Sequence, residues 1–165
     1  MDIVRSLGQV DSTVLAAYIL SRDKPMSHLK LQKLLYFIEG YHLAYFDGKS
    51  LIEDEFQAWA HGPVSRKIFD ELKDKSILYG DLIYTVKEGE EPPVNILRES
   101  ITSTQFEVIE EVLSMYTNYS GLQLEDITHS QTPWLKARQG YAPGDRCENV
   151  ISRDDMLSYF KGFLN

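Results

Sequence analysis

The segment that most constrains the fold is residues 28–46, which is apolar on more than one side. Ser27 can cap a helix here and Asp47-Gly48 can end it. A helix that is apolar on several sides is usually buried by several neighbours. The sequence therefore predicts a central helix of about 30 Å. Its main stripe, at helical spacing, is Leu31, Leu34, Leu35, Ile38, His42 and Tyr45, and Leu29, Phe37 and Tyr41 lie off that stripe.

Shorter helices are predicted on both sides of this segment from local start and stop signals. Asp11 or Ser12 can cap a first helix, which must end before Pro25 because the residue before a proline avoids the helical region. Later starts are marked by two capping boxes, by a proline at a first helical position and by a serine cap. These signals are Thr102 with Gln105, Ser120 with Gln123, Thr132-Pro133 and Ser152.

A small β element is predicted after the central helix. Residues 56–60 alternate between apolar and other side chains, which is typical of a short strand, and residues 82–86 are a second candidate. Pro63 suits the first position of a helix that runs to about Lys73. Residues 87–93 are polar apart from proline and predict a mobile loop. We therefore expect residues 1–165 to form a mainly α, single compact helical domain with a central long helix and a small antiparallel β element.

Composition narrows the class of partner. The 165 residues carry 17 Lys and Arg against 25 Asp and Glu, a net charge of −8, with a single cysteine and no long apolar run. One cysteine cannot form an internal disulfide, and no stretch predicts a membrane span, so we expect a cytoplasmic protein. These numbers argue against binding to nucleic acid, because such binding depends on cations that neutralise phosphates. An acidic surface is better suited to a basic protein partner.

The sequence predicts no metal, cofactor or catalytic centre. His28 and His42 are fourteen positions apart, about 21 Å along a helix, which is too far to share an ion. Cys147 has no local sign of an activated thiol, and we interpret it as an ordinary loop cysteine. His61 and His129 are expected to satisfy backbone groups at helix boundaries rather than to act in catalysis.

Aromatic residues are abundant and permit two interpretations. Trp59 and Trp134 each stand near a helix start, and several tyrosines fall on the central and final helices. Core packing is the favoured interpretation, and an aromatic-rich contact surface is the alternative, because protein interfaces are enriched in Trp and Tyr. Both can hold for different members of the set. The tyrosines concerned are Tyr36, Tyr41, Tyr45 and Tyr159.

Three stretches resemble the Panacea domain, the SocA-like antitoxin family that also occurs in phage-associated proteins. They are LKLQKLLYFIEGYHLAYFDGKSL (29–51), EFQAWAHGPVSRKIFDELK (55–73) and DITHSQTPWLKAR (126–138). Their order and spacing agree with the family, with Ile127 where the family often has leucine. The resemblance marks a set that we call the signature residues: Trp59, Gly62, Pro63, Val64, Thr128, His129, Pro133 and Trp134.

The resemblance implies a helical antitoxin of a type II-like toxin–antitoxin system. Such a protein neutralises a co-encoded protein toxin by direct binding, needs no cofactor and is not an enzyme. We expect the signature residues to preserve the scaffold, with the toxin contacts on other surfaces. Two alternatives stay open: a proteolytic adaptor that delivers a toxin to an AAA+ protease, and a protein of another class, either a DNA-binding regulator or an enzyme that depends on Cys147 or His61.

Overall fold

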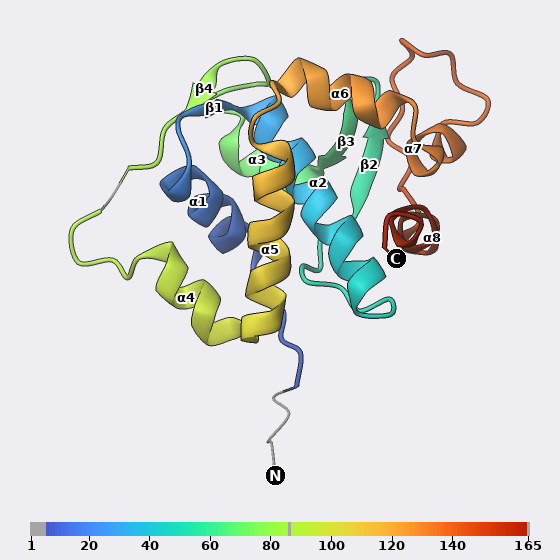
Figure 1. Cartoon of the computed structure of the whole chain (residues 1–165). Coiled ribbons are helices and arrows are strands. Elements are labelled where there is room, and N and C mark those ends of the chain that lie inside the picture. The colour runs from blue at the N-terminus through green and yellow to red at the C-terminus, as the bar shows by residue number, and fades with distance from the viewer. Residues whose placement is uncertain (1–5, 86, 165) are drawn as a thin grey trace.

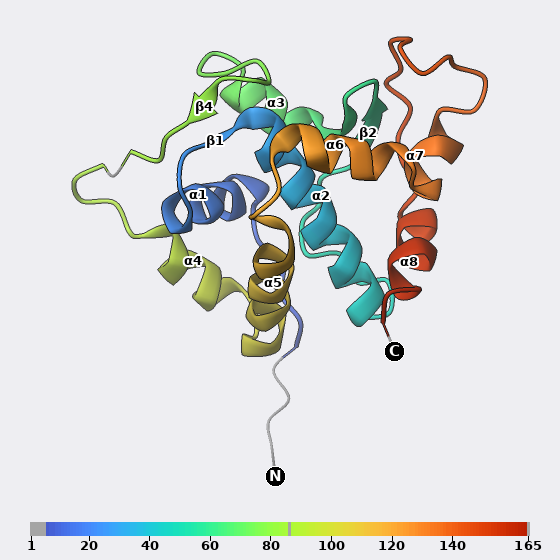
Figure 2. The same cartoon turned by 45° about the horizontal axis from the view of Figure 1, so that its top comes forward.

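The computed structural model describes residues 6–85 and 87–164, with helix α2 (His28–Tyr45) at its centre. The Ser27 side chain caps α2 by accepting a hydrogen bond from the Lys30 amide at 3.1 Å. Every residue of α2 is buried except Lys30 and Tyr45. Helices lie on several sides of it in both views (Figures 1 and 2). The prediction of a central buried helix is confirmed.

The helices around α2 begin where the sequence signals placed them. The Asp11 side chain caps the first helix, and both capping boxes form in full, from Thr102 with Gln105 and from Ser120 with Gln123. In Figure 1, α5 and α8 lie on opposite sides of the lower half of α2, and α6 crosses above them. The elements are α1 (Ser12–Arg22), α5 (Ser103–Tyr116), α6 (Gly121–His129), α7 (Thr132–Ala137) and α8 (Arg153–Lys161).

The larger β element is an antiparallel hairpin of β2 (Phe56–Trp59) and β3 (Gly62–Ser65), in which Trp59 faces Gly62. The far edge of β2 pairs with the segment 149–151, through a bridge from Gln57 to Val150. Strand β3 is therefore the outer strand of this element, which is the position where a proline is tolerated in a sheet. The hairpin places the end of β2 and the start of β3 beside α6 and α7.

The expected helix start at Pro63 is wrong. Pro63 lies in β3 opposite Ala58, and helix α3 (Arg66–Leu72) begins only after Ser65, whose side chain accepts a hydrogen bond from the Ile68 amide at 3.2 Å. Pairing of residues 62–65 with the strand 56–59 outweighs the local preference of proline for a first helical position, because Gly62 can adopt the positive φ of 96° at the turn.

The region between α3 and α5 differs most from the expectation. The predicted strand over residues 82–86 is only β4 (Asp81–Leu82), which pairs with β1 (Met26–Ser27), and Val86 lies outside the described residues. Residues 87–92 form no helix or strand, but Pro93 begins a helix that the sequence analysis missed, α4 (Pro93–Ser100). Its Leu97 is fully buried, and α4 packs against α1. None of the helices within residues 6–85 and 87–164 is long and apolar enough to cross a membrane.

Candidate functional site

The fold brings the signature residues together at the place where the β2–β3 hairpin contacts the corner between α6 and α7. We call this contact the hairpin junction. The Trp134 indole donates from Nε1 to the carbonyl of Trp59 at 2.8 Å, and His129 donates from Nε2 to the carbonyl of Ala60 at 2.8 Å. The His129 and Trp134 rings stack with centroids 4.5 Å apart. Side chains of the α6–α7 corner thus hold the outer end of the hairpin by hydrogen bonds to the hairpin's backbone carbonyls.

A lysine from the central helix completes the junction. Lys33 of α2 is fully buried and donates from Nζ to the carbonyl of Pro63 at 2.8 Å. Gly62 lies against it: a Cβ at that position would be 2.6 Å from the Lys33 Cε and 2.7 Å from the Thr128 Oγ1. Burial lowers the pKa of Lys33 to about 7, and the nearby Glu125 opposes that shift only in part. Only the position of Lys33 within a helix that is apolar on several sides could have indicated from the sequence that this lysine is buried.

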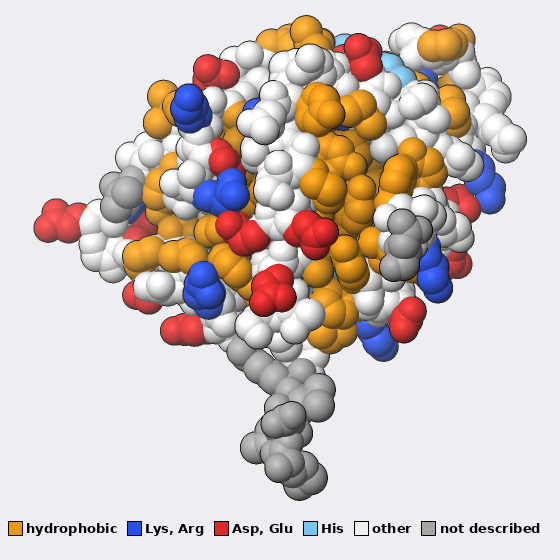
Figure 3. Space-filling view, viewed as in Figure 1, with side chains coloured by type: hydrophobic (Ala, Val, Ile, Leu, Met, Phe, Trp, Pro, Cys, Tyr) orange, Lys and Arg blue, Asp and Glu red, His pale blue; other side chains and the backbone are white. Residues whose placement is uncertain are grey.

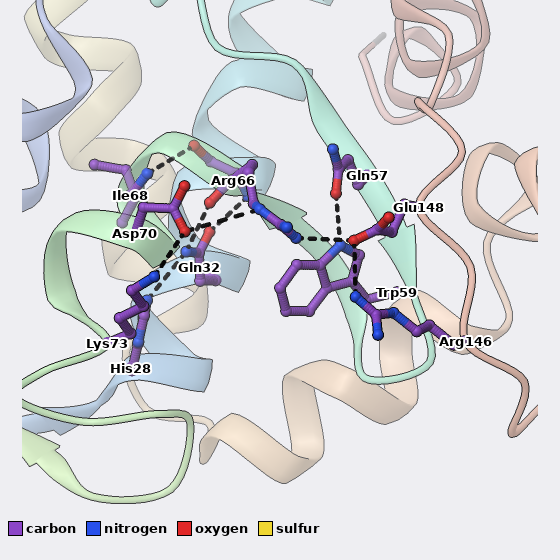
Figure 4. A network of polar contacts seen from close by, with 11 residues as sticks. His28, Gln32, Gln57, Trp59, Arg66, Ile68, Asp70, Lys73, Arg146 and Glu148 are labelled. Carbon is purple, nitrogen blue, oxygen red and sulfur yellow. Dashed lines mark hydrogen bonds and ion pairs between the residues drawn. The ribbon is translucent and has the colours of Figure 1, made fainter.

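Two further polar residues of α2 fix the base of the hairpin. The Gln32 side chain accepts from the Ser65 amide at 2.8 Å and donates to the Ser65 carbonyl at 3.2 Å (Figure 4). It also donates to Nε2 of His28 at 3.1 Å, while Nδ1 of His28 donates to the Ser76 carbonyl at 2.8 Å. This arrangement requires a neutral imidazole, and burial lowers the pKa of His28 accordingly. The side chain of His28 is therefore structural.

Arg138 connects the junction to the loop that precedes the last helix. Its buried guanidinium donates to the carbonyl of Ala58 at 2.8 Å and to the carbonyls of Ala142 and Asp145, both at 2.7 Å. In the sequence this residue stands out only as the last member of the stretch 126–138 that resembles the family. The structure shows its role, because one cation satisfies carbonyls from two distant segments.

A cavity of about 380 Å³ opens beside the hairpin. Its wall includes the Trp59 and Phe69 rings, which meet edge to face at 4.8 Å. At its rim Arg66 and Arg146 both approach the carboxylate of Glu148, at 2.9 and 3.4 Å (Figure 4). These two cations lower the pKa of Glu148, with Arg66 the stronger influence. Each of these two arginines is thus paired with a carboxylate of the same chain.

Cys147 and His61 both line this cavity, which is relevant to the enzyme alternative. His61 donates from Nδ1 to Glu125 at 3.0 Å rather than to a backbone group, so that part of its prediction is wrong. Among the residues that the structure describes, no hydrogen bond joins Cys147 to His61, and no cluster of three or more His, Cys, Asp or Glu side chains could hold a metal. The geometry therefore gives no activated nucleophile at this place.

Comparison with known proteins identifies the family. Residues 31–135 match the family described as "Antitoxin SocA-like, Panacea domain". The chain belongs to this family. The matched range contains every signature residue and ends directly after Trp134. The chain is also 32% identical over 157 residues to the protein named "Antitoxin SocA" of Caulobacter vibrioides, a similarity that covers 86% of this chain and 80% of that protein. No solved structure matches this SocA-like chain.

In this SocA-like protein the signature residues belong to the internal frame more than to an open surface. Pro63, Val64, Thr128 and Trp134 are buried, and Gly62 is enclosed between Lys33 and Thr128. Trp59 is half-buried and faces the cavity. The residues on which the resemblance depends are those that join the hairpin, α2 and the α6–α7 corner.

Proposed function

We propose that this protein is an antitoxin that neutralises a co-encoded protein toxin by binding it directly in the cytoplasm. The observation that carries the proposal is the similarity to Antitoxin SocA over 86% of the chain, together with the family match. The protein acts stoichiometrically, by covering the toxin or holding it inactive. A stable complex of this kind buries about 800 Å² on each partner. Residues 1–165 act as one domain in this function.

The hairpin junction supports a binding role rather than a catalytic one. Lys33, Arg138 and His129 all donate to backbone carbonyls, and His28 is held neutral between two hydrogen bonds. These groups stabilise the frame, and their donors are engaged within the chain. A rigid frame is what a stoichiometric binder needs, because a preorganised surface loses little conformational entropy when a partner docks.

The test uses the product of the adjacent open reading frame as the probe. We expect that product alone to arrest growth, co-expression of this protein to restore growth, and an affinity tag on either chain to recover both in a one-to-one complex. An adjacent gene product that is harmless alone, or a toxic one that this protein neither binds nor neutralises, would overturn the proposal. The half-life of the toxin separates the mechanisms: direct inhibition leaves it unchanged, whereas promoted proteolysis shortens it.

Two substitutions at the cavity test the enzyme alternative in the same assay. Cys147→Ala and His61→Gln remove the only thiol and the only imidazole among the residues that line the cavity. We expect both variants to rescue growth as the wild-type protein does, because a stoichiometric binder needs no thiol or imidazole chemistry. Rescue that disappears in either variant, with an unchanged unfolding midpoint and an intact complex, would favour an enzyme.

A further inference from the structure

A strip of aromatic side chains lies across α5, α2 and α8, and none of its members lines the cavity. We call it the aromatic band. Figure 3 shows apolar side chains as a vertical strip between α5 and α8, above the lower half of α2. Its members come from the ends of α2, α5 and α8 and from the turns that follow α5 and α8. They are the exposed Tyr45, Tyr119 and Phe163, the half-buried Tyr116 and Tyr159, and the buried Tyr41 that links them.

Ring contacts join most of the band into one surface. Tyr119 contacts Tyr116 at 6.3 Å, Tyr116 contacts Tyr41 at 6.2 Å, and Tyr41 contacts Phe163 at 6.2 Å. Phe163 in turn contacts Tyr159 at 5.3 Å. The hydroxyl groups of Tyr41 and Tyr116 are 2.9 Å apart and share a hydrogen bond. The rings are therefore held in fixed relative positions before any partner arrives.

The core lies directly beneath the band and supports it. Phe37 stacks on Tyr116 with centroids 4.4 Å apart, and the fully buried Phe160 contacts Tyr41 at 5.0 Å. The outer rings face solvent instead: Tyr45 and Tyr119 are each 41% exposed and Phe163 is 54% exposed. Exposed aromatic rings on a rigid base are the side chains that contribute most to protein interfaces, because they bury a large area at a small cost in entropy.

The α5 edge of the band is acidic. Glu107 and Glu111 are both exposed on α5, and no ion pair joins either to a cation in the part of the chain that the structure describes. Glu111 accepts from the Tyr45 hydroxyl at 3.4 Å, so its carboxylate lies directly at the band. The chain as a whole carries a net charge of −8, while α8 ends in the exposed Lys161. A partner that fits this face brings apolar side chains for the rings and a cation for the α5 edge.

We propose that the aromatic band is the surface on which the toxin docks, and that the toxin presents a segment of apolar side chains with Lys or Arg along one side. This inference rests on the proposed function and names the surface that performs it. The band and the hairpin junction are then separate in role: the junction maintains the fold, and the band recognises the partner.

Matched alanine variants test the proposal with the purified adjacent gene product as the probe. Tyr119→Ala and Phe163→Ala remove exposed rings of the band, and Ile77→Ala and Ile83→Ala, each 69% exposed and outside it, are the controls. We expect each band variant to raise the Kd by about tenfold or more and each control by less than about threefold. Thermal unfolding of every variant confirms that it remains folded.

The double variant Glu107→Gln/Glu111→Gln tests whether the acidic edge of the band speeds association with the partner. We expect the association rate of the wild-type protein to fall as salt is added, and that of the double variant to be slower at low salt and less sensitive to salt. A rate that is independent of salt in the wild-type protein would refute a basic segment as the partner chemistry.

The outcomes separate this inference from the function on which it depends. Wild-type protein that does not bind the adjacent gene product contradicts both. Wild-type protein that binds, with band variants no weaker than the controls, contradicts the docking surface and leaves the antitoxin function in place. A self-association that sedimentation detects in the wild-type protein and that Phe163→Ala abolishes would show that a second copy of this chain occupies the band instead.

Discussion

The hairpin junction and the aromatic band use aromatic and polar groups in opposite ways. At the junction the Trp134 indole is 4% exposed and its N–H donates to a backbone carbonyl. In the band the Phe163 ring is 54% exposed although it contacts the Tyr159 ring at 5.3 Å. The junction side chains make their contacts within the chain, whereas the outer rings of the band stay exposed and can contact a partner. The motif that identifies the family therefore lies largely in the buried frame, and on our proposal the surface for the partner lies elsewhere.

This difference leads to a simple expectation for substitutions. A change at the junction lowers the free energy of unfolding and affects toxin binding only through the loss of folded protein. A change in the band lowers affinity and leaves the folded state nearly as stable as before. Four substitutions or conditions test whether junction residues stabilise the fold and band residues do not, from the largest expected effect on stability to the smallest.

Trp134→Ala has the largest expected effect. It removes a buried indole and leaves the carbonyl of Trp59 without its donor, which costs about 3–5 kcal/mol for a large aromatic side chain. Urea unfolding followed by circular dichroism measures the loss. Trp134→Phe is the control, because it keeps an aromatic ring while it removes the hydrogen bond and part of the ring volume, at a smaller loss of about 1–3 kcal/mol. A Trp134→Ala variant of wild-type stability that no longer binds the toxin would move this residue from the frame to the contact surface.

Gly62→Ala follows, at about 2–4 kcal/mol, since it combines backbone strain with a steric clash. Gly62 has a φ of 96°, and a Cβ there would come within 2.6 Å of the Lys33 side chain. Gly140→Ala is the matched control, because Gly140 has a φ of 90° with nothing within 4 Å. The difference between the two unfolding free energies isolates the clash. Equal losses would show that Lys33 moves aside and that the junction is less tightly packed than the structure indicates.

The lowered pKa of the buried Lys33 predicts how the free energy of unfolding depends on pH. Its pKa is about 7 in the folded protein and 10.5 in an exposed lysine. Between these values the unfolded chain holds a proton that the folded protein has released, so the free energy of unfolding rises with pH across this window. Urea unfolding between pH 7 and about pH 9.5, below the ionisation of ordinary tyrosine, measures the slope. Lys33→Met flattens the slope. An unchanged slope in that variant would assign the titration to another group.

The sequence was most informative where the controlling contacts are local. The capping boxes of Thr102 with Gln105 and Ser120 with Gln123 formed as predicted, because each joins residues three positions apart. The strand at Pro63 was missed because its partner strand, and not its own pattern, decides its conformation. Helix α4 was missed although Pro93 begins it, because the acidic segment before it dominated the pattern.

The candidate site was predictable in its members but not in its contacts. The resemblance named Trp59 and Trp134, yet their hydrogen bond spans 75 positions. Arg138 reaches the carbonyl of Ala58 over 80 positions, and no local pattern distinguishes that role from an ordinary charge near a helix end. The tyrosines differ in burial, since Tyr36 is fully buried and Tyr45 is exposed, and the contact-surface interpretation stays a prediction for the exposed ones. Burial of this kind depends on which helices pack against α2, and this is a property of the whole fold.

The smallest effect on the free energy of unfolding is expected for Phe163→Ala. The matched comparison is Phe160→Ala, at a buried position nearby in the chain. The two phenylalanines lie three positions apart, Phe160 in the last turn of α8 and Phe163 just after its end, with Phe160 fully buried and Phe163 54% exposed. Phe163→Ala loses a partly exposed ring and its contacts, so we expect a decrease of less than about 1 kcal/mol in the free energy of unfolding, against about 3–5 kcal/mol for Phe160→Ala. Urea unfolding of both variants measures this difference directly. A loss above about 2 kcal/mol for Phe163→Ala would mean that the aromatic band stabilises the fold, and its rings could then no longer be interpreted as a surface reserved for a partner.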